Sequence, residues 1–366
     1  MTKPSCQIDD AEELRHSPLS ILLDAVQKAH GSYFWDGAHD QTGLPFDRRH
    51  KGNATTIDLV SIGGTGFGIM VLVVLVHRKL ISRKEACLRL LAIMQSLEQI
   101  DRFRGAFPHF VRPSHLKIVR WKPRDDGGDL VETSLLIQGL ICAREFFSGL
   151  SVEETDLRQR INIICDAVEW ANYVRPGARP SLYWHWSPQY SWYKNTPITG
   201  WNEALVAYIL AAGSSTHPID PGVYQRGWKN DGKYLNGQSY YGHQLPAGTP
   251  FGGPLFLSQY SFCALDPRQL LDNDLDYWQQ AVAHATINYE HCNRNPNGYA
   301  GYGQCGWGLT SSDGPDGYLA SCPVNDHGVL SPTAALSSFP FLPEQAEAAL
   351  RAFLSYQNGG LWSGCH

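Results

Sequence analysis

The sequence predicts an all-α fold, and three observations support this prediction. Several segments of roughly 15–20 residues carry apolar side chains at helical spacing. We find no run with the alternation of apolar and polar residues that marks a half-buried strand. Pro and Gly concentrate between the helical segments, in residues 177–200, 213–256 and 293–332. A single layered domain with long loops on one face is the simplest architecture, and a toroid of paired helices would gather such loops around one cleft.

Helix-start signals justify the elements in order along the chain. Ser17 is a candidate cap for the first helix, and the pairs Ser82/Glu85 and Ser151/Glu154 have the Ser-x-x-Glu spacing of a capping box. The helical patterns that follow these and similar signals define the predicted elements. The predicted helices span residues 18–30, 82–103, 130–147, 151–173, 202–212, 274–289, 333–338 and 343–356.

The segment Gly-Gly-Thr-Gly-Phe-Gly at residues 63–68 interrupts a mostly apolar stretch, 57–77. It invites comparison with a phosphate-binding loop. However, it lacks the Lys-Ser/Thr of a P-loop and does not match Gly-x-Gly-x-x-Gly after a strand. Close helix packing or a backbone bend at the rim of a cleft therefore explains these glycines better.

Composition limits the classes of partner. Of the 366 residues, 43% are hydrophobic and 18% are charged, as in a well-buried globular protein. The net charge of −5 argues against nucleic acid or an anionic membrane as the main partner, because both require a basic patch. The chain is rich in Trp and Tyr, with 11 and 17 residues. Stacking on sugar rings is one explanation for them, and a core lined with amphipathic aromatic residues is the other.

The cysteines favour neither a metal site nor a disulfide framework. The nine Cys are scattered without a Cys-x-x-Cys pair, and Cys87, Cys142 and Cys165 fall in helical apolar patterns as buried free thiols would. We expect no cofactor. Residues 1–20 contain no apolar signal region, and the apolar run 69–76 is too short to span a bilayer. The sequence thus predicts a cytoplasmic protein, or a periplasmic or secreted one if a leader precedes this chain.

Four carboxylates gather within eight residues: Asp125, Asp126, Asp129 and Glu132. Two glycines lie inside this cluster, which a merely solvated surface would not need. Cleavage of a glycosidic bond requires a proton donor and a proton acceptor, so clustered acids point to a carbohydrate-cleaving cleft. The alternative is a helix N-cap followed by an acid in the first turn, where the helix dipole stabilises negative charge.

A fifth candidate acid is Glu203, in the segment Gly200-Trp201-Asn202-Glu203. A carboxyl group that lies against an indole loses hydration, which raises its pKa and keeps it protonated near neutral pH. A general acid needs this environment. The alternative is again a first-turn Glu that complements the helix dipole.

Aromatic residues accompany both groups of acids. Trp184 and Trp186 would face the same way in an extended loop, with His185 between them and Tyr190 close behind. They could stack on sugar rings or anchor the loop to the core, and His185 has no second ligand at metal-binding spacing. Further candidates for contact with a hydroxyl-rich ligand lie downstream: Tyr241, Phe256, Tyr260 and Asp313, the last of which could also be a turn residue.

The chain resembles the glucoamylase-like family, which includes bacterial β-1,2-glucan hydrolases (glycoside hydrolase family 144) and a domain of cyclic β-1,2-glucan synthases. Nine ordered segments carry the resemblance: 60–68, 101–103, 105–110, 125–132, 183–186, 200–203, 239–242, 252–256 and 332–338. It runs from about residue 31 to the end. It implies an N-terminal segment with a short helix in residues 1–30 and an (α/α)6 toroidal catalytic domain in residues 31–366.

The resemblance also implies inverting hydrolysis of β-1,2-linked glucan. The family's important acids fall on Asp125, Asp129, Glu132 and Glu203. We expect Glu203 to be the general acid, while Asp129 and Glu132 bind sugar hydroxyls or help to move a proton from the attacking water. Inversion leaves room for that water, so the working carboxyl groups should lie roughly 6.5–9.5 Å apart.

The end of the chain departs from the family pattern. Relatives usually continue beyond the segment that resembles Leu361-Trp362 with a further helix pair, whereas this chain stops at His366. We therefore expect a toroid without its last helix pair. Two alternatives to hydrolysis stay open: a transglycosylase on the same glucans, which would differ by excluding water, and a catalytically weak glucan-binding protein, which the short C-terminus favours. The sequence leaves the oligomeric state open.

Overall fold

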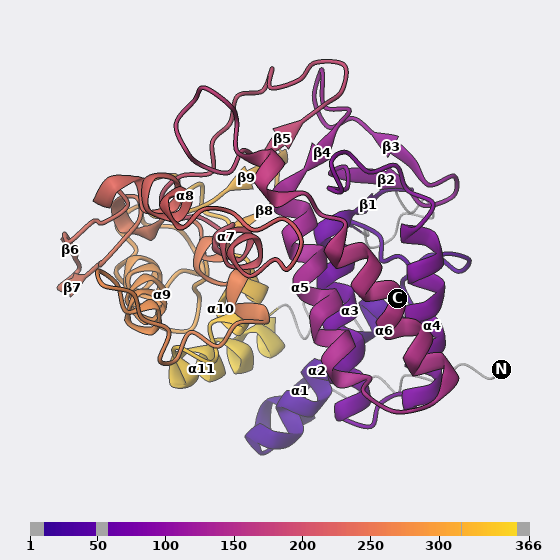
Figure 1. Ribbon diagram of the computed structural model, residues 1–366. Coiled ribbons are helices and arrows are strands. Elements are labelled where there is room, and N and C mark those ends of the chain that lie inside the picture. The colour runs from indigo at the N-terminus through magenta and orange to yellow at the C-terminus, as the bar shows by residue number, and fades with distance from the viewer. Residues whose placement is uncertain (1–10, 49–57, 316, 357–366) are drawn as a thin grey trace. The chain divides into compact units, whose positions relative to one another are not determined.

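The computed structural model describes residues 11–48, 58–315 and 317–356, and it is mostly helical with several small sheets (Figure 1). The chain divides into two compact units. Unit 1 comprises Met1–Gln27, Gly200–Glu203 and Gly232–His366, and unit 2 comprises Lys28–Thr199 and Ala204–Asp231. The helix α2 (Leu19–Trp35) contributes to both units, and each unit is described by itself.

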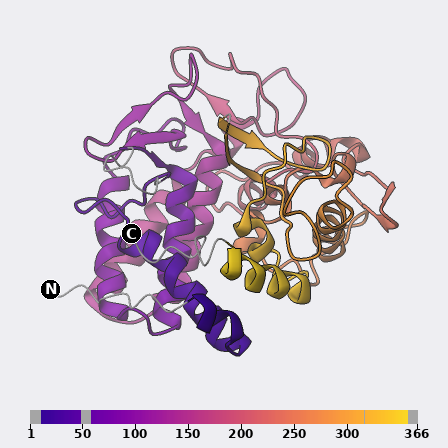
Figure 2. The ribbon, with the colours of Figure 1, turned by 180° about the vertical axis from the view of Figure 1, so that it is seen from behind.

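Unit 2 is built around helices that lie side by side, purple to magenta in Figure 1 and again in the reverse view of Figure 2. Its central pair is α3 against α5, while α4 packs on α6 and α7 packs on α5. The helices of this unit are α3 (Ile62–His77), α4 (Arg83–Leu97), α5 (Leu130–Phe146), α6 (Val152–Asp166), α7 (Leu205–Ala212) and the single turn α8 (Pro221–Val223), with η1 (Trp170–Tyr173) and the π-helical turn η2 (Tyr224–Trp228) between and after them.

The glycine-rich segment lies inside α3 and permits its close approach to α5. A Cβ atom on Gly66 would come within 2.1 Å of the carbonyl oxygen of Leu135, and one on Gly139 would come within 2.2 Å of the carbonyl oxygen of Gly66. Two backbones this close leave no space for a side chain on either helix. The prediction of close helix packing for these glycines is confirmed.

The two predicted capping boxes differ in the structure. Ser82 and Glu85 form the reciprocal pair of hydrogen bonds, so this prediction is confirmed. Ser151 accepts from the backbone N–H of Glu154, but the Glu154 carboxylate is bound by Arg83 at 2.7 Å and by the N–H of Gly149 at 2.7 Å. The second box was therefore a wrong prediction, because a cation from another helix competes for its glutamate.

The predicted helix ends are less accurate than the starts. α4 ends at Leu97 rather than at 103, and α6 ends at Asp166 rather than at 173. In both cases the next backbone N–H groups bond three residues back, as in Ile100 to Leu97 and Val168 to Cys165, which tightens and ends the helix. α7 begins three residues later than predicted, whereas α2 continues beyond residue 30 to Trp35.

Short strands correct the expectation of a chain without them. In unit 2, β1 (Val60–Ser61), β2 (Phe110–Arg112) and β3 (Lys117–Val119) form an antiparallel sheet, and β4 (Gly128–Asp129) pairs with β5 (His185–Trp186). Elements of two or three residues are too short to show a period-two pattern, which is why the sequence concealed them.

Unit 1 combines helices with hairpins and short 3₁₀ turns. α1 packs on α11, and α10 packs on α11, shown in yellow in Figure 2. The α-helices are α1 (Ala11–His16), α9 (Tyr277–Arg294), α10 (Pro332–Ser337) and α11 (Pro343–Ser355). The hairpins are β6 (Ser239–Tyr240) with β7 (His243–Gln244) and β8 (Ser311–Gly314) with β9 (Gly317–Ala320). The 3₁₀ turns are η4 (Pro250–Gly252), η5 (Leu255–Ser258) and η6 (Ser261–Cys263), while η3 (Asn230–Gly232) contributes to both units.

Two apolar clusters hold unit 1 together. One joins α1, α2 and α11 through Leu14, Leu22 and Leu350, all at most 4% exposed. The other lies around Trp307 and Leu309, which are fully buried beside α9. In their described residues, the long segments predicted to be loops contain turns and elements of a few residues, which confirms the prediction. Among the described helices, none has the length and hydropathy needed to cross a bilayer.

Candidate active site

The acid cluster of unit 2 is built around Asp129, at the junction of β4 and α5. Asp129 is the N-cap of α5, and its Oδ1 accepts the backbone N–H groups of Val131 and Glu132, each at 3.0 Å. Its Oδ2 accepts from His109 Nδ1 at 2.8 Å and from the indole N–H of Trp184 at 3.0 Å. With four donors and only 4% exposure, this carboxylate is a fixed anion whose lone pairs are occupied.

The two glycines in the cluster are required by close packing. A Cβ atom on Gly127 would come within 2.0 Å of the carbonyl oxygen of Trp186, and one on Gly128 would come within 2.2 Å of the hydroxyl of Tyr173. They let β4 lie directly against β5, so that Asp129 pairs with His185 in register. This explains why glycine separates the acids along the sequence.

Glu132, in the first turn of α5, lies in a different environment from Asp129. Its Oε2 accepts the backbone N–H of Gly63 at 2.7 Å, at the start of α3, while its Oε1 faces His109 Nε2 at 3.8 Å. The side chain is 15% exposed. Burial raises the pKa of Glu132 from 4.5 to about 7, although the charge of His109 acts in the opposite direction. Glu132 is thus the carboxyl group of this cluster suited to accept or release a proton near neutral pH.

His109 joins the two acids, because each ring nitrogen faces one of them. Burial by itself lowers the pKa of His109, but the charge of Glu132 and the hydrogen bond and charge of Asp129 outweigh it and raise the pKa to about 9. The imidazole is therefore a cation at neutral pH, held between two carboxyl groups. Its ring also contacts the indole of Trp121, with the centroids 4.7 Å apart.

Asp125 lies on the side of the cluster formed by the loop after β5. One oxygen is 3.3 Å from His185 Nε2, and the other is 3.3 Å from Lys194 Nζ. Burial lowers the pKa of His185, so this imidazole is neutral, in contrast to His109. Lys194 is the cation that balances Asp125.

Asp126 anchors the same loop. It accepts from the hydroxyl of Ser187 at 2.7 Å and lies 3.3 Å from Arg120 Nη2. Ser187 in turn accepts the backbone N–H of Tyr190 at 3.2 Å, and the Tyr190 ring is 38% exposed. Asp126 therefore fixes the turn that presents Tyr190 to solvent.

The two tryptophans of the loop have different roles. Trp184 directs its N–H to Asp129, as described above, and is half-buried. Trp186 lies under the guanidinium of Arg104, whose Cζ is 3.9 Å from the ring centroid. Both contacts tie the loop to unit 2. The prediction that these indoles stack on sugar rings stays a prediction.

Trp201, Asn202 and Glu203 belong to unit 1. Trp201 is 6% exposed, donates its indole N–H to Ser258 at 3.1 Å and packs against Tyr277. The backbone carbonyl of Glu203 accepts from Ser261 at 2.8 Å, and its side chain is half-buried. Since Asp129 and Glu132 belong to unit 2, their predicted meeting with Glu203 across a cleft stays a prediction.

The remaining predicted contact residues are spread over unit 1. Tyr241, with a φ of 53°, bonds through its hydroxyl to His291 Nδ1 at 2.9 Å. Phe256 and Tyr260 pack on each other with their centroids 5.2 Å apart, and Tyr260 is 36% exposed. Asp313 is exposed on β8, where it pairs with Tyr318 of β9.

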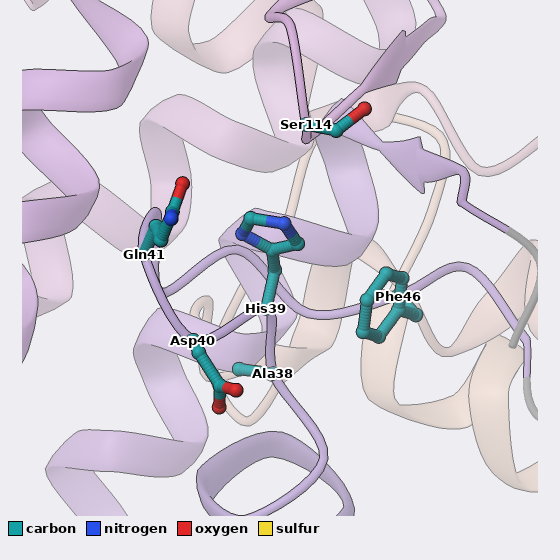
Figure 3. A pocket seen from close by; sticks show the side chains of 6 residues that line it. All are labelled: Ala38, His39, Asp40, Gln41, Phe46 and Ser114. Carbon is teal, nitrogen blue, oxygen red and sulfur yellow. The ribbon is translucent and has the colours of Figure 1, made fainter.

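Unit 2 also contains a hollow of about 420 Å³ that is lined by residues outside the acid cluster. Figure 3 shows His39 in the middle of its side chains, which are Ala38, His39, Asp40, Gln41, Phe46 and Ser114. The hydroxyl of Thr42 lies 3.1 Å from Nδ1 of His39. None of the predicted site residues lines this hollow, so it does not locate the acid cluster.

Known proteins are similar to this chain in sequence and in fold. The family model Glycoamylase ("Putative glucoamylase") matches residues 195–364. An endo-β-1,2-glucanase from Chitinophaga pinensis, solved in complex with sophorotriose and glucose, is 41% identical with a TM-score of 0.89, over 97% of this chain and 85% of that one. This chain belongs to the glucoamylase-like family.

Two further matches come from Parabacteroides distasonis. An exo-β-1,2-glucooligosaccharide sophorohydrolase (non-reducing end) is 39% identical over 93% of this chain. A β-1,2-glucanase structure from the same organism is 38% identical, with a TM-score of 0.88 over 94% of this chain. This chain spans about half the length of the sophorohydrolase, 50%, and 52% of the second protein.

Sequence reasoning missed two residues of the acid cluster. His109 lies within one of the segments that resemble the glucoamylase-like family, 105–110, but its position between Asp129 and Glu132 depends on contacts over 20 and 23 residues of chain. Trp121 begins the acidic stretch and was left without a role. The available signal for His109 was its place in a segment that precedes the acids among the resembling motifs, and order along the chain does not by itself identify a contact.

Proposed function

We propose that this protein is a glycoside hydrolase that cleaves β-1,2-linked glucan. The single observation that carries the proposal is the arrangement of Glu132 beside His109 and Asp129. It combines a carboxyl group whose pKa is raised to about 7 with a fixed anion and a cation in one partly buried cluster. Membership of the glucoamylase-like family supports the reaction class, and the names of the β-1,2-glucan hydrolases above support the linkage.

In the proposed reaction, Glu203 donates a proton to the oxygen of the leaving sugar as the bond from that oxygen to the anomeric carbon breaks. Water attacks the anomeric carbon from the opposite face and gives a proton to Glu132. One oxygen of Glu132 is held by Gly63, which leaves the oxygen on the His109 side for this proton. The outcome is inversion, with the two carboxyl groups roughly 6.5–9.5 Å apart.

Asp129 serves this reaction as a positioning residue. Its lone pairs are taken by His109, Trp184 and the start of α5, so it holds these groups instead of accepting the proton from water. Asp125 and Asp126 stabilise the loop that presents His185, Trp186 and Tyr190. In the proposal these side chains contact sugar hydroxyls and ring faces, together with the unit 1 residues predicted to bind substrate.

The proposal includes an (α/α)6 toroid as the fold of residues 31–366. The mostly helical architecture and the paired helices of unit 2 support it, as does the similarity to the glucanase structures above. In such a toroid the loop-rich ends of the helices gather around one mouth, which would bring acids from distant segments to one substrate.

The test is hydrolysis of linear β-1,2-glucan, with β-1,3- and β-1,4-glucans as controls. New reducing ends from the β-1,2-linked polymer alone are expected, and proton NMR should show the α-anomer as the first product. A single disaccharide product indicates attack from a chain end, and a ladder of products indicates attack within the chain. Glu203→Gln should lower kcat at least ~10²-fold. Full activity of this variant, with its circular dichroism spectrum unchanged, would remove Glu203 as the general acid.

A further inference from the structure

We propose that the indole of Trp121, which packs against His109, stacks on one glucosyl ring of the substrate and so serves as a platform for it. The inference rests on the proposed function and assigns a substrate contact that the sequence prediction did not include. It is carried by the position of an exposed indole against the buried group that joins Asp129 and Glu132.

The local fold holds Trp121 beside His109. β2 and β3 pair antiparallel with Phe110 opposite Val119, so the residues just before β2 and just after β3 lie next to each other. The Trp121 ring contacts the His109 ring with centroids 4.7 Å apart and planes at 49°. It also contacts Phe110 edge to face, with centroids 5.9 Å apart.

One side of the indole is thus supported while much of the rest faces solvent. Trp121 is 54% exposed, whereas the His109 side chain is only 14% exposed. A cationic imidazole against an indole is a favourable contact, and Asp129 fixes that imidazole through a hydrogen bond of 2.8 Å. The platform is therefore rigid before any ligand arrives, which lowers the entropy cost of binding.

The surroundings of the exposed face suit a sugar. A pyranose offers a face of C–H bonds to an aromatic ring and a rim of hydroxyls to polar groups. The ammonium of Lys122 lies over the Trp121 ring, 5.1 Å from its centroid, so a sugar stacked on that side would displace it from the ring toward the hydroxyl rim. Isolated exposed aromatic residues are common and need no explanation. Trp121 differs because it is connected through one side chain to the acids of the cluster.

The competing explanation is that Trp121 only shields His109 from water. The two explanations predict different measurements. Loss of a shield would hydrate His109 and shift the pH dependence of kcat, while affinity for sugar would remain. Loss of a platform would weaken sugar binding at every pH.

The experiment compares Trp121→Ala with Trp121→Phe in the full chain. Binding of sophorose is measured by calorimetry, and kcat and KM are measured on linear β-1,2-glucan across pH. For Trp121→Ala we expect at least about tenfold weaker binding and a correspondingly higher KM, with kcat within about threefold of the unmodified protein. Trp121→Phe should recover most of the affinity, because it restores a ring. Tyr356→Ala removes a ring that is equally exposed, at 54%, but distant along the chain in unit 1, and should change neither quantity.

The outcomes separate this inference from the proposed function. If the unmodified protein cleaves β-1,2-glucan and Trp121→Ala binds sophorose as tightly, the platform is overturned and the hydrolase stands. A shifted pH profile with unchanged affinity likewise overturns it in favour of the shield. If the unmodified protein neither releases reducing ends nor binds sophorose, both are overturned.

Discussion

Each unit contains a buried histidine–aspartate pair with the same short distance between its two partners. In unit 2, His109 Nδ1 lies 2.8 Å from Asp129, and in unit 1, His291 Nε2 lies 2.8 Å from Asp326. The histidines are similarly protected, with side chains 14% and 3% exposed. By distance and chemistry alone the two pairs are nearly the same.

The two pairs differ in the partner of the second ring nitrogen of the histidine. His291 Nδ1 bonds to the hydroxyl of Tyr241 at 2.9 Å, whereas His109 Nε2 faces the carboxyl group of Glu132 at 3.8 Å. A hydroxyl completes the hydrogen bonds of a neutral or charged imidazole, but a second carboxyl group makes protonation of His109 and of Glu132 depend on each other. The His291–Asp326 pair therefore has complete hydrogen bonds, whereas His109 and Glu132 can exchange a proton.

Asp326 itself is fully occupied. It accepts from the hydroxyl of Tyr302 at 2.6 Å and from the backbone N–H of Gly328 at 3.1 Å in addition to His291, and its side chain is 1% exposed. Burial alone raises the pKa of Asp326, but these hydrogen bonds outweigh it and the pKa is lowered. The difference teaches that a buried His–Asp pair is structural when a hydroxyl completes the hydrogen bonds of the histidine, and becomes a candidate for catalysis when a second carboxyl group faces the other ring nitrogen.

The largest expected effect is on kcat, and it separates Glu132, the acid proposed to exchange a proton, from Glu154, an acid that is paired with Arg83. Glu132→Gln should lower kcat on β-1,2-glucan by about 10²–10⁴-fold, because it removes the group proposed to accept the proton from water. Glu154→Gln is the matched control, since Glu154 is also the third residue of a helix but is paired with Arg83. It should lower the melting temperature and leave kcat unchanged. Equal loss of activity in both variants would contradict a special role for Glu132.

The next effect tests the His291–Asp326 pair of unit 1. Asp326→Asn should lower the free energy of unfolding by roughly 1–3 kcal/mol, because it removes the carboxylate that accepts buried hydrogen bonds from His291 and Tyr302. The folded fraction should keep its kcat. Urea unfolding measures the first quantity and the reducing-end assay the second. Asp266→Asn, which breaks an exposed pair with Arg268, should have little effect on either. A large loss of kcat with normal stability would make the unit 1 pair catalytic as well.

The smallest effect concerns pH. The pKa of Glu132 is raised to about 7 from 4.5, so the folded state binds this proton more tightly and stability falls as pH rises through that interval. The pKa of His109 is raised to about 9 from 6.5, so its contribution is complete below 6.5 and is lost as pH rises through 9. Urea unfolding between pH 5 and 9 should therefore show declining stability at high pH, measured at about one-unit steps.

The matching variant for this test is His109→Gln. It should remove the part of the decline that follows the titration of His109 and leave the part that follows Glu132. It should also raise the pKa of Glu132 further, since the charge of His109 opposes the effect of burial. An unchanged slope in this variant would mean that other groups cause the decline.

Much of the fold could be predicted because the signals are local. The capping box at Ser82 is complete within four residues, and the helix that contains Leu130 and Phe146 follows from its own apolar pattern. Exclusion of phosphate-binding motifs left close packing or a backbone bend for the glycines of 63–68, and the structure decided for close packing. Predictions failed where a distant residue intervened, as when Arg83 took the carboxylate of Glu154 from its expected partner Ser151.

By itself the sequence determined the helical class, the family, and the gathering of acids at 125–132, because all three depend on residues that are near each other in the chain or on the order of motifs. Only the tertiary structure decided which acid can exchange a proton. Glu132 is bound by Gly63, 69 residues away, and Asp129 by Trp184, 55 residues away. The pKa of a carboxyl group depends on desolvation and on nearby charges, and both are properties of neighbours in space.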